Sequence, residues 1–538
     1  MRVSLTIGGV HDRRGVIVAG IISPMLNTAE DIAQLNPGQL RDRVIRQAAQ
    51  IEERDRELVW RQAKIDKLTF EIALLRRAQF GTRSEQLSGE QLDLFAESID
   101  ADIAAVEAEV KSLAPARAPT PDAAPKASPK RAPLPAHLPR TEIHHEPEST
   151  ACTCGCALRR IGEDVAEKLD YTPGVFTVER HIRGKWVCDQ CEKLTQAPVP
   201  AQVIDKGIPT TRLLSQVLVA KYLDHLPLYR LESIFERAGM AIARSTLAEW
   251  VGQCGVALQP VVDALKAALL AHPVLHADET PVAMLKPGLG KTHRAYLWSY
   301  SVGAHESMKA VVYDFAESRA GCHAEAFLGE WRGTLVCDDY AGYKNLLSKG
   351  LIEAGCMAHA RRKFFELFAA NQSSLADQAL AYFGKLYGVE REAAQLDAEA
   401  RLQLRQENAK PIAAAFHTWL KTQRLQVPEG SATARAIDYS LRRWAALTHY
   451  LTDGKVPIDN NWIENQIRPI ALGRKNWLFA GSLRAGERAA AVMSLIQSAK
   501  LNGLDPLAYL TDVLERLPTQ PNSRIGELLP HRWAPGVR

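Results

Sequence analysis

A proline-rich stretch divides this chain and limits what can fold on either side of it. Residues 114–140 read APARAPTPDAAPKASPKRAPLPAHLPR, with eight prolines within 25 residues. Proline fixes its own φ angle and lacks a main-chain donor, so such a run favours an extended, semi-rigid tether over helix or sheet. Its Lys and Arg residues could touch DNA phosphates, but we favour a solvated linker. We therefore expect a domain boundary at residues 113–145.

The segment before the tether carries a seven-residue apolar repeat. Within residues 38–78, apolar side chains recur at one position and are joined by a second set: Val44, Ile51, Leu58, Ile65 and Ile72, with Leu40, Leu68 and Leu75. A sustained repeat of this kind is typical of a coiled coil. Polar residues interrupt the second set at Gln47, Arg54 and Arg61, so the coil should be weak in its middle.

We predict a coiled coil or helix over residues 36–112, with self-association through the apolar seam. The alternative is a single helix that packs on its own protein. We expect residues 1–35 to be a poorly ordered extension.

Five of the nine cysteines lie between residues 152 and 191, after the tether. The segment VFTVERHIRGKWVCDQC (175–191) alternates like a strand and should turn near Arg183 and Gly184. Two cysteine groups around a hairpin suit a tetrahedral four-thiolate zinc site. Buried free thiols are the weaker alternative, because so small and polar a segment needs a staple to fold. We predict a zinc-binding β module at residues 146–196 that uses Cys188, Cys191 and two of Cys152, Cys154 and Cys156.

Residues 197–265 are predicted to be helical. Within them LPLYRLESIFERAGMAIARSTLAEWVGQ (226–253) reads as helix, glycine-centred turn and helix, with Ser245 placed to cap the second helix. Leu247 and Trp250 should lie on its packed side. DNA-binding helix-turn-helix units share this shape, and so do many other helical hairpins. We expect a DNA-binding region of the helix-turn-helix type.

Residues 266–500 change to a pattern of strands and helices. Two apolar runs end in acids, HPVLHADETPV and GTLVCDDYAGY, and between them stand the strand-like HRAYLWSYSV and MKAVVYDF and the helical CHAEAFL. This pattern indicates an α/β domain. From about residue 370 to 455 the pattern is purely helical, which predicts an all-helical insertion. Residues 501–538 should form a C-terminal helical segment and tail.

Three acids stand in settings that suit a metal ion. Asp278 and Asp338 close apolar strands, and Glu464 lies in a helix-like segment with three cations, Arg468, Arg474 and Lys475. Carboxylates suit Mg²⁺ or Mn²⁺, and two such ions ~3.5–4 Å apart can activate a nucleophile and stabilise a leaving oxygen in phosphoryl transfer. The cations would hold DNA near the scissile phosphate. From the residues alone, an equal alternative makes these acids solvated strand ends and salt-bridge partners.

Several segments together carry a resemblance to a known family. They are LLRRAQFGTRSEQL (74–87), LRRIGEDVAEKLDY (158–171), HADETPV (276–282), DDYAGY (338–343), CMAHARRKF (356–364), DNNWIENQIRPIALGRKNWLFAGS (459–482) and SAKLNGLDPLAYL (498–510). On these segments the chain resembles the transposases of the IS66 insertion-sequence family, from about residue 38 to 535. The resemblance implies a multidomain protein with a zinc-binding domain and an RNase H-like DDE catalytic domain that has a helical insertion before its last acid.

Matched residue by residue, the family motifs imply that Asp278, Asp338 and Glu464 are catalytic and hold two Mg²⁺ or Mn²⁺ ions. The adjacent Glu279 and Asp339 fall outside this set, since the family pattern commonly has a glycine where Asp339 stands.

The segment CMAHARRKF lies between the strand region and the predicted insertion. We interpret Arg361, Arg362 and Lys363 as phosphate contacts beside the active site, and His359 as a residue that could orient a phosphate or a water. Cys356 is interpreted as a packing residue, because no partner ligand for a metal site of Cys356 and His359 lies nearby in the sequence.

With the resemblance, the sequence predicts a DNA transposase that cuts at the ends of its element and joins the freed 3′-hydroxyl to target DNA. Expected partners are inverted-repeat ends, target DNA, further copies of the chain bound through the coil, and small accessory proteins of the same element. Two alternatives stay open: a DNA-binding regulator that kept the fold but lost catalysis, and an RNase H-like nuclease or resolvase without strand joining.

The net charge of +4 is small for 538 residues, so affinity for DNA must come from local basic patches. No run approaches the ~18 apolar residues that a membrane span needs. We expect a cytoplasmic, nucleoid-associated bacterial protein with structural Zn²⁺.

Overall fold

The computed structural model describes residues 37–80, 89–113, 133–147, 149, 151, 156–172, 174–286, 291–303 and 305–535. The chain divides into two compact units, residues 1–67 and 68–538. In the described residues, no helix is long and apolar enough to cross a membrane.

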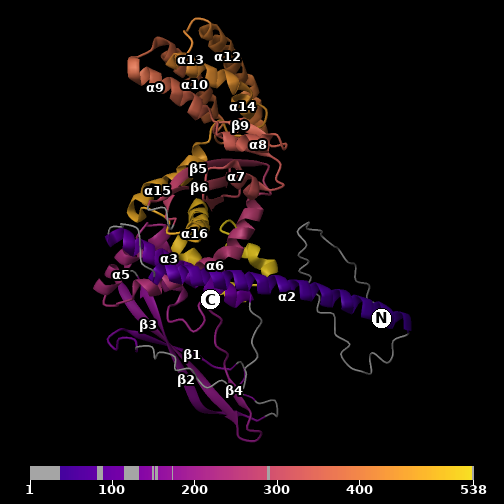
Figure 1. Cartoon of the computed structure of the whole chain (residues 1–538), viewed down its shortest axis with the longest axis vertical. Coiled ribbons are helices and arrows are strands. Elements are labelled where there is room, and N and C mark those ends of the chain that lie inside the picture. The colour runs from indigo at the N-terminus through magenta and orange to yellow at the C-terminus, as the bar shows by residue number, and fades with distance from the viewer. Residues whose placement is uncertain are drawn as a thin grey trace. The chain divides into compact units, whose positions relative to one another are not determined.

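The described part of the first unit is the beginning of helix α2 (Pro37–Phe80), which is drawn unbroken in Figure 1. Its surface carries ion pairs one helical turn apart, such as Arg61 with Glu57 at 2.5 Å. Ile51 and Leu58 of the seven-residue repeat are 59% and 56% exposed. The predicted helix is therefore confirmed, and a partner for its apolar seam stays a prediction.

The cysteine segment forms a small sheet, visible in Figure 1. Its strands are β1 (Arg140–His145), β2 (Leu158–Thr172), β3 (Val175–Cys188) and β4 (Leu194–Gln196). Strand β3 pairs antiparallel with β2 and β4 and parallel with β1. At the end of the sheet opposite the cysteines, Tyr171, Phe176 and Phe235 form an aromatic cluster with ring centroids 4.6–5.2 Å apart.

The predicted turn near Arg183 and Gly184 is wrong. Strand β3 continues through both residues, and Gly184 pairs with Glu163 of β2. A Cβ atom on Gly184 would lie 2.9 Å from the Trp186 indole nitrogen, so the glycine makes room for that side chain. The connection between β2 and β3 instead lies at Gly174, whose φ of +85° suits glycine.

Three helices follow the module and lie between it and the second sheet in the sequence. They are α4 (Thr211–Tyr222), α5 (Leu228–Arg237) and α6 (Arg244–Leu269). Leu247 and Trp250 are buried in α6, as expected. The predicted cap at Ser245 is wrong, because α6 begins one residue earlier and Glu232 of α5 accepts the Arg244 main-chain N–H at 2.9 Å. An acid from the neighbouring helix thus does the work of a local cap.

The second sheet has five strands in the order β7-β6-β5-β8-β9. They are β5 (Val274–Met284), β6 (His293–Val302), β7 (Val311–Ala316), β8 (Thr334–Cys337) and β9 (Ile352–Gly355). The pairs β5–β6 and β6–β7 are antiparallel, whereas β5–β8 and β8–β9 are parallel. Between β7 and β9 lie α7 (Gly321–Leu328), η1 (Ala341–Tyr343) and α8 (Lys344–Leu347). The α/β character predicted for this region is confirmed.

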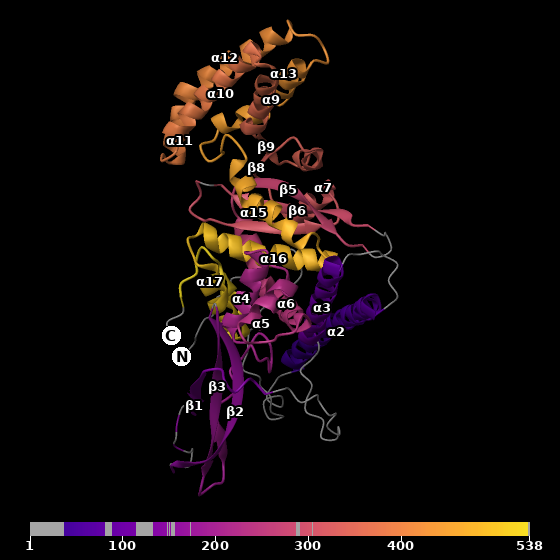
Figure 2. The same ribbon diagram turned by 90° about the vertical axis from the view of Figure 1, so that its left-hand side faces the viewer.

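Helices after residue 460 cover this sheet. They are α15 (Asn461–Trp477), α16 (Leu483–Leu501) and α17 (Pro506–Arg516), followed by η4 (Leu517–Thr519) and η5 (Asn522–Leu528). Helix α15 packs on β5 and α16 packs on β7, as Figure 2 shows for α16. The hydroxyl oxygens of Ser498 and Ser494 accept the main-chain N–H groups of Val311 and Tyr313, at 3.0 and 2.8 Å. Strand β7 is an edge of the sheet, and α16 therefore closes that edge.

The residues between β9 and α15 are helical and have their own apolar core. The elements are α9 (Met357–Asn371), α10 (Ser374–Glu392), α11 (Ala398–Leu404), η2 (Arg405–Ala409), α12 (Lys410–Arg424), α13 (Ala432–Arg442), α14 (Trp444–Thr448) and η3 (His449–Leu451). Phe364, Phe383 and Phe416 are fully buried at the centre of this helical subdomain (residues 357–451). Buried Arg405 pairs with Glu390 at 2.7 Å and donates to three main-chain carbonyls. The helical subdomain separates α15 from the strands in sequence.

Helix α3 (Gly89–Leu113) packs closely on α6. Gly252 of α6 allows this contact, because a Cβ atom added there would lie 2.3 Å from the Ala101 carbonyl oxygen.

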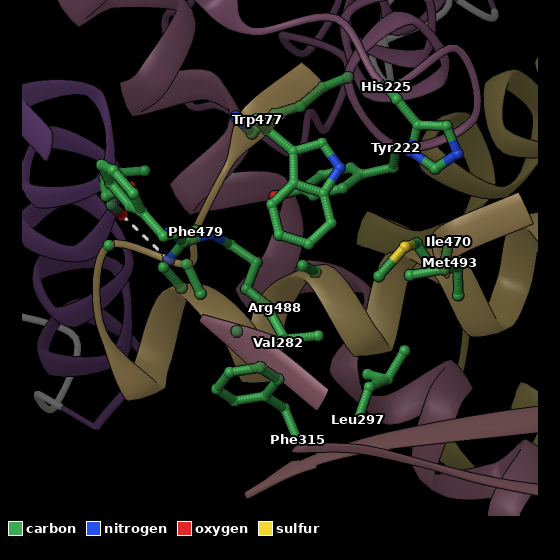
Figure 3. Close-up of a pocket in the computed structure, with 18 of the residues that line it drawn as sticks. Tyr222, His225, Val282, Leu297, Phe315, Ile470, Trp477, Phe479, Arg488 and Met493 are labelled. Carbon is green, nitrogen blue, oxygen red and sulfur yellow. Dashed lines mark hydrogen bonds between the residues drawn. The ribbon is translucent and has the colours of Figure 1, made fainter. Parts of the chain in front are cut away.

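Beside α3, a cavity of about 80 Å³ lies between α4, α15, α16 and the sheet (Figure 3). Apolar side chains such as Phe315 and Met493 line it. The charge at its wall is neutralised, because Arg488 forms a buried pair with Asp102 at 2.9 Å.

Candidate active site

Asp278 lies in the part of β5 that does not pair with β8. Strand β8 pairs with β5 only at residues 274–276, while β6 pairs with β5 to its end. Asp278 is therefore inside a strand, and the prediction that it closes one is wrong, because β5 continues antiparallel to β6 as far as Met284. It does lie two residues beyond the parallel-paired part, and its carboxylate accepts the Glu279 main-chain N–H at 2.9 Å.

Asp338 follows directly after the last residue of β8, as predicted. Because β5 and β8 are parallel, both acids lie at the same edge of their pairing. The Asp338 carboxylate accepts the Tyr340 main-chain N–H at 2.9 Å, which fixes it at the start of the next turn.

Glu464 lies in the first turn of α15, the helix that packs on β5. The pKa of Asp278 is raised to about 8, chiefly by burial and then by the charge of Glu279, with smaller contributions from Asp338 and Glu464. Asp278 keeps partial contact with solvent, yet loss of hydration is still the main cause. The three predicted acids thus come from three separate elements and lie within electrostatic range of one another. A crowded group of carboxylates with a raised pKa is a setting that a cation would stabilise.

The adjacent acids are engaged in other contacts. Glu279 is buried, because successive residues of a strand face opposite sides. Its carboxylate pairs with Arg319, with Nε to Oε1 at 2.6 Å, and accepts the Tyr343 hydroxyl at 2.9 Å. Asp339 lies 3.7 Å from Lys344 and 3.6 Å from Arg443. Both acids therefore brace the strands and loops around the site.

Cys356 and His359 lie closer to Glu464 than the sequence suggested. Cys356 is the residue before α9, and one ligand atom from each of Cys356, His359 and Glu464 lies within 4.8 Å of the others. No partner ligand lies nearby in the sequence, but the fold brings one, Glu464 of α15, to Cys356 and His359 from the far side of the helical subdomain. The C-x-x-H spacing, which puts two donors on one helix face, was the available signal.

Asn460 joins three of the elements around the site, and sequence reasoning missed it. Its Oδ1 accepts from His276 Nδ1 at 2.7 Å, and its Nδ2 donates to the Ala277 carbonyl at 2.9 Å. Its main-chain N–H donates to Cys356 Sγ at 3.2 Å. Burial lowers the pKa of His276 to about 4, so this histidine is neutral and its Nδ1 carries the proton. Asn460 thereby holds β5 just before Asp278, and α15 just before Glu464.

The predicted phosphate contacts of α9 are exposed. Arg361 and Lys363 lie over the rings of Phe365 and Tyr439, at 5.6 and 4.5 Å from the centroids. Arg362 is half-exposed and lies 3.8 Å from the Glu464 carboxylate. This helix therefore brings a positive surface to the edge of the acidic site.

The cations of α15 are spread along the helix. Arg468 and Lys475 are exposed, whereas Arg474 donates to the Thr280 hydroxyl at 3.1 Å and to the Pro281 carbonyl. Arg474 follows Glu464 by ten residues, about 15 Å along a helix. The structure therefore ties Arg474 to β5 rather than bringing it to the acids.

The described cysteines of the module gather at one end of its sheet. Cys188 ends β3 and is buried against Cys156, Leu158 and Trp186. Its carbonyl accepts the Glu192 N–H at 2.8 Å in a turn that also carries Cys191. Cys152 and Cys154 lie outside the described residues. These thiols are soft donors of the kind that zinc prefers.

Comparison with known families covers most of the chain. Residues 206–488 match the model described as Transposase IS66 family, and residues 494–531 match the IS66 C-terminal element. Residues 149–192 match the zinc-finger binding domain of transposase IS66, and residues 67–143 match a model described as Transposase C of IS166 homeodomain.

Similar proteins occur in Sinorhizobium fredii. The uncharacterized protein y4jD is 36% identical over 483 residues, which cover 87% of this chain and 94% of that protein. The uncharacterized protein y4qI is 37% identical over 493 residues, which cover 88% of this chain and 90% of that protein.

Proposed function

This chain belongs to the IS66 family of transposases, and from that premise we propose that it cuts DNA at the ends of an insertion sequence and joins the freed 3′-hydroxyl to target DNA. One observation carries the proposal. Asp278, Asp338 and Glu464, which are far apart in the sequence, come within electrostatic range, and the charges of Asp338 and Glu464 add to the rise in the pKa of Asp278 that burial and Glu279 cause.

These three acids would hold divalent cations, Mg²⁺ or Mn²⁺, in a site for two ions. The donor set fits, because carboxylate oxygens are the ligands these ions prefer, and Glu464 Oε1 is a buried oxygen that has no hydrogen-bond partner among the residues the structure describes. When bound, such ions activate an attacking oxygen and stabilise a leaving oxygen in phosphoryl transfer.

The protein's own contribution is to hold the acids in place before DNA arrives. The main-chain N–H groups of Glu279 and Tyr340 fix the carboxylates of Asp278 and Asp338. Asn460 holds the start of α15 against β5. A rigid arrangement of this kind lowers the cost of reorganisation during the reaction.

We assign the RNase H-like fold to residues 266–500, with the helical subdomain as its insertion. The five-stranded sheet supports this, since two of its strands bring an acid to one edge and a helix that packs on the sheet adds the third.

DNA would lie along the exposed cations of α9, Arg361, Arg362 and Lys363, and approach Arg468 and Lys475 of α15. Phosphate contacts of this kind give affinity and position the strand without reading its sequence. His359, whose Nδ1 lies 3.8 Å from Glu464, would orient a phosphate or a water.

The module would bind one zinc ion through Cys188, Cys191 and two of Cys152, Cys154 and Cys156. The contact of Cys156 with Cys188 supports Cys156 as one of them. With the helices α4–α6, the module would help to recognise the inverted-repeat ends, while α2 would pair copies of the chain. Small accessory proteins of the same element would complete the assembly.

The test uses purified protein, a labelled duplex that ends in the element's own inverted repeat, a target plasmid and Mg²⁺. Cleaved and joined products are expected. Cleavage without joining would favour a nuclease or resolvase, and binding without cleavage would favour a silent regulator. Either result would overturn the proposal.

A further inference from the structure

Cys356, His359 and Glu464 present three different donor atoms to one small space. The thiol sulfur, a ring nitrogen and a carboxylate oxygen all lie within 4.8 Å of one another. His359 Nδ1 and Glu464 Oε1 are 3.8 Å apart. Both atoms are shielded from solvent, and in the described part of the chain neither has a hydrogen-bond partner, which is costly for buried polar atoms.

The elements that carry these donors are fixed to one another. Cys356 directly precedes α9, His359 lies three residues later in its first turn, and Glu464 lies in the first turn of α15. The two helix starts are joined by a hydrogen bond from the Met357 N–H to the Ile458 carbonyl at 3.1 Å, and by the Asn460 N–H to Cys356 Sγ at 3.2 Å. The three donor atoms are therefore already close together, and no loop has to move to form the site.

We propose that this trio is a second metal site, separate from the cysteine module, for a thiophilic divalent cation such as Zn²⁺. Thiolate, imidazole and carboxylate together suit Zn²⁺, whereas Mg²⁺ prefers oxygen ligands alone. Three protein ligands leave a fourth position open to water. On binding, the cation takes the place of the Cys356 thiol proton, which leaves to solvent, and the Asn460 N–H remains as a donor to the thiolate.

This site would share Glu464 with the proposed Mg²⁺ centre, a consequence that rests on the proposed function. A cation held by Cys356 and His359 would bind Glu464 Oε1 and withdraw that carboxylate from Asp278 and Asp338. Zinc and magnesium would then compete for one side chain, and free Zn²⁺ would act as an inhibitor of the transposase.

The binding test uses the full chain with its module already loaded with zinc, titrated with Co²⁺. Co²⁺ bound to thiolate gives charge-transfer absorption, so a second ion at Cys356 is visible directly. We expect this signal in the wild type and in the control Cys322→Ser, which changes an exposed cysteine of α7. It should be lost in Cys356→Ser, and His359→Asn should weaken Co²⁺ binding at least about tenfold, as expected for loss of one ligand.

Zinc content and circular dichroism, measured first, check that each variant is folded with its module loaded. If Cys356→Ser fails to fold, His359→Asn still tests the site, because the His359 side chain is partly exposed and its replacement should disturb the fold less. No Co²⁺–thiolate signal in the folded wild type, or an equal signal in Cys356→Ser, would overturn the site.

The competition test measures the fraction of Mg²⁺-dependent cleavage that remains as Zn²⁺ is added, relative to each protein's own rate. Wild type should be inhibited, and Cys356→Ser should need at least about tenfold more Zn²⁺. Equal inhibition would overturn the sharing of Glu464. Protein that binds Co²⁺ through Cys356 but never cleaves DNA would contradict the proposed function and leave the metal site standing.

Discussion

At the scale of single residues, two pairs of adjacent acids have opposite surroundings. The carboxylates of Asp278 and Asp338 accept hydrogen bonds from main-chain N–H groups. Glu279 and Asp339 are paired with arginine or lysine. Spacing in the sequence cannot separate such neighbours, because each pair differs by one position. Asp278 and Glu279 differ because successive side chains of a strand face opposite sides of the sheet. Asp338 and Asp339 differ because the loop after β8 gives each carboxylate different partners.

Asp338→Asn should lower cleavage by several orders of magnitude, because the change keeps the shape of the side chain but removes a charge that a divalent ion requires. Asp339→Asn is the matched control and should cost less than about tenfold, since Asp339 is an exposed partner of Lys344 and Arg443. A metal-dependent cleavage assay measures both. Equal losses of cleavage in the two variants, or a loss only in Asp339→Asn, would contradict the assignment of Asp338 as the metal ligand.

The raised pKa of Asp278 predicts how stability depends on pH in the absence of divalent ions. Its folded-state pKa of about 8 lies above the ordinary value of 3.8. Between these values the folded protein binds more protons than the unfolded chain, so the free energy of unfolding falls as pH rises. Asp278→Asn cannot titrate, and its fall should be smaller. Melting temperatures of both proteins at pH 5 and pH 8 test this, and parallel falls would contradict it.

At the scale of elements, the active site depends on how α15 is joined to β5 and α9. Asn460 makes these joints with its side chain and its main chain. Strands β5 to β8, helices α5 to α7 and the three acids could be predicted, because each has a local pattern or a family motif. The predicted end of the linker at residue 145 is wrong, because residues 140–145 form strand β1 through pairing with β3. The role of Asn460 could not, since its partner His276 lies 184 residues away and an asparagine before a helix has no distinct pattern.

The wrong predictions have the same origin. Gly184 and Ser245 have side-chain chemistry that suits a turn and a cap, and nearby sequence gives no other use for them. The structure uses Gly184 to admit the Trp186 ring and caps α6 with Glu232 from α5. In both cases a tertiary contact replaces the local preference.

Asn460→Ala should lower the free energy of unfolding by roughly 1–3 kcal/mol, because His276 Nδ1–H and the Ala277 carbonyl lose their buried partner. Asn461→Ala is the control, since among the described residues its exposed amide bonds only to Asp459, and it should cost less than about 0.5 kcal/mol. Urea unfolding followed by tryptophan fluorescence measures the difference. Similar costs for the two variants would refute the proposed joint.

Arg361→Ala combined with Arg362→Ala should weaken DNA binding and reduce its dependence on salt. Each lost phosphate contact removes about 0.9 from the slope of log K against log salt, so a fall of about 2 is expected. Binding to an end duplex is measured from 50 to 200 mM salt. Arg442→Ala combined with Arg435→Ala, on α13, serves as the control of equal charge. If both double variants change the slope equally, α9 has no special place in binding.

At the scale of the whole molecule, the two units differ in how their apolar side chains are buried. The second unit has a continuous core that joins the module, the helices and the sheet. The described helix of the first unit presents Ile51 and Leu58 to solvent. An apolar seam of this kind is stable in water only with a partner surface.

Leu58→Lys combined with Ile65→Lys should therefore lower the mass of the assembly measured by light scattering. The charges would face the partner helix within the seam. Ala49→Lys combined with Ala63→Lys adds the same charge at exposed positions off the seam and should leave the mass unchanged. If the seam variant also keeps its mass, the single-helix alternative stands.

The closure of the β7 edge by α16 has a consequence for synthesis on the ribosome. The hydroxyl that bonds the Val311 N–H belongs to a residue 187 positions later. At roughly 5–20 residues per second, translation needs about 10–40 s to add that many residues. During this time the growing chain exposes an unfinished strand edge, which is a template for pairing with neighbouring nascent chains on the same message. Slow codons within the helical subdomain would lengthen that exposure, so the yield of folded transposase depends on how fast residues 317–498 are translated.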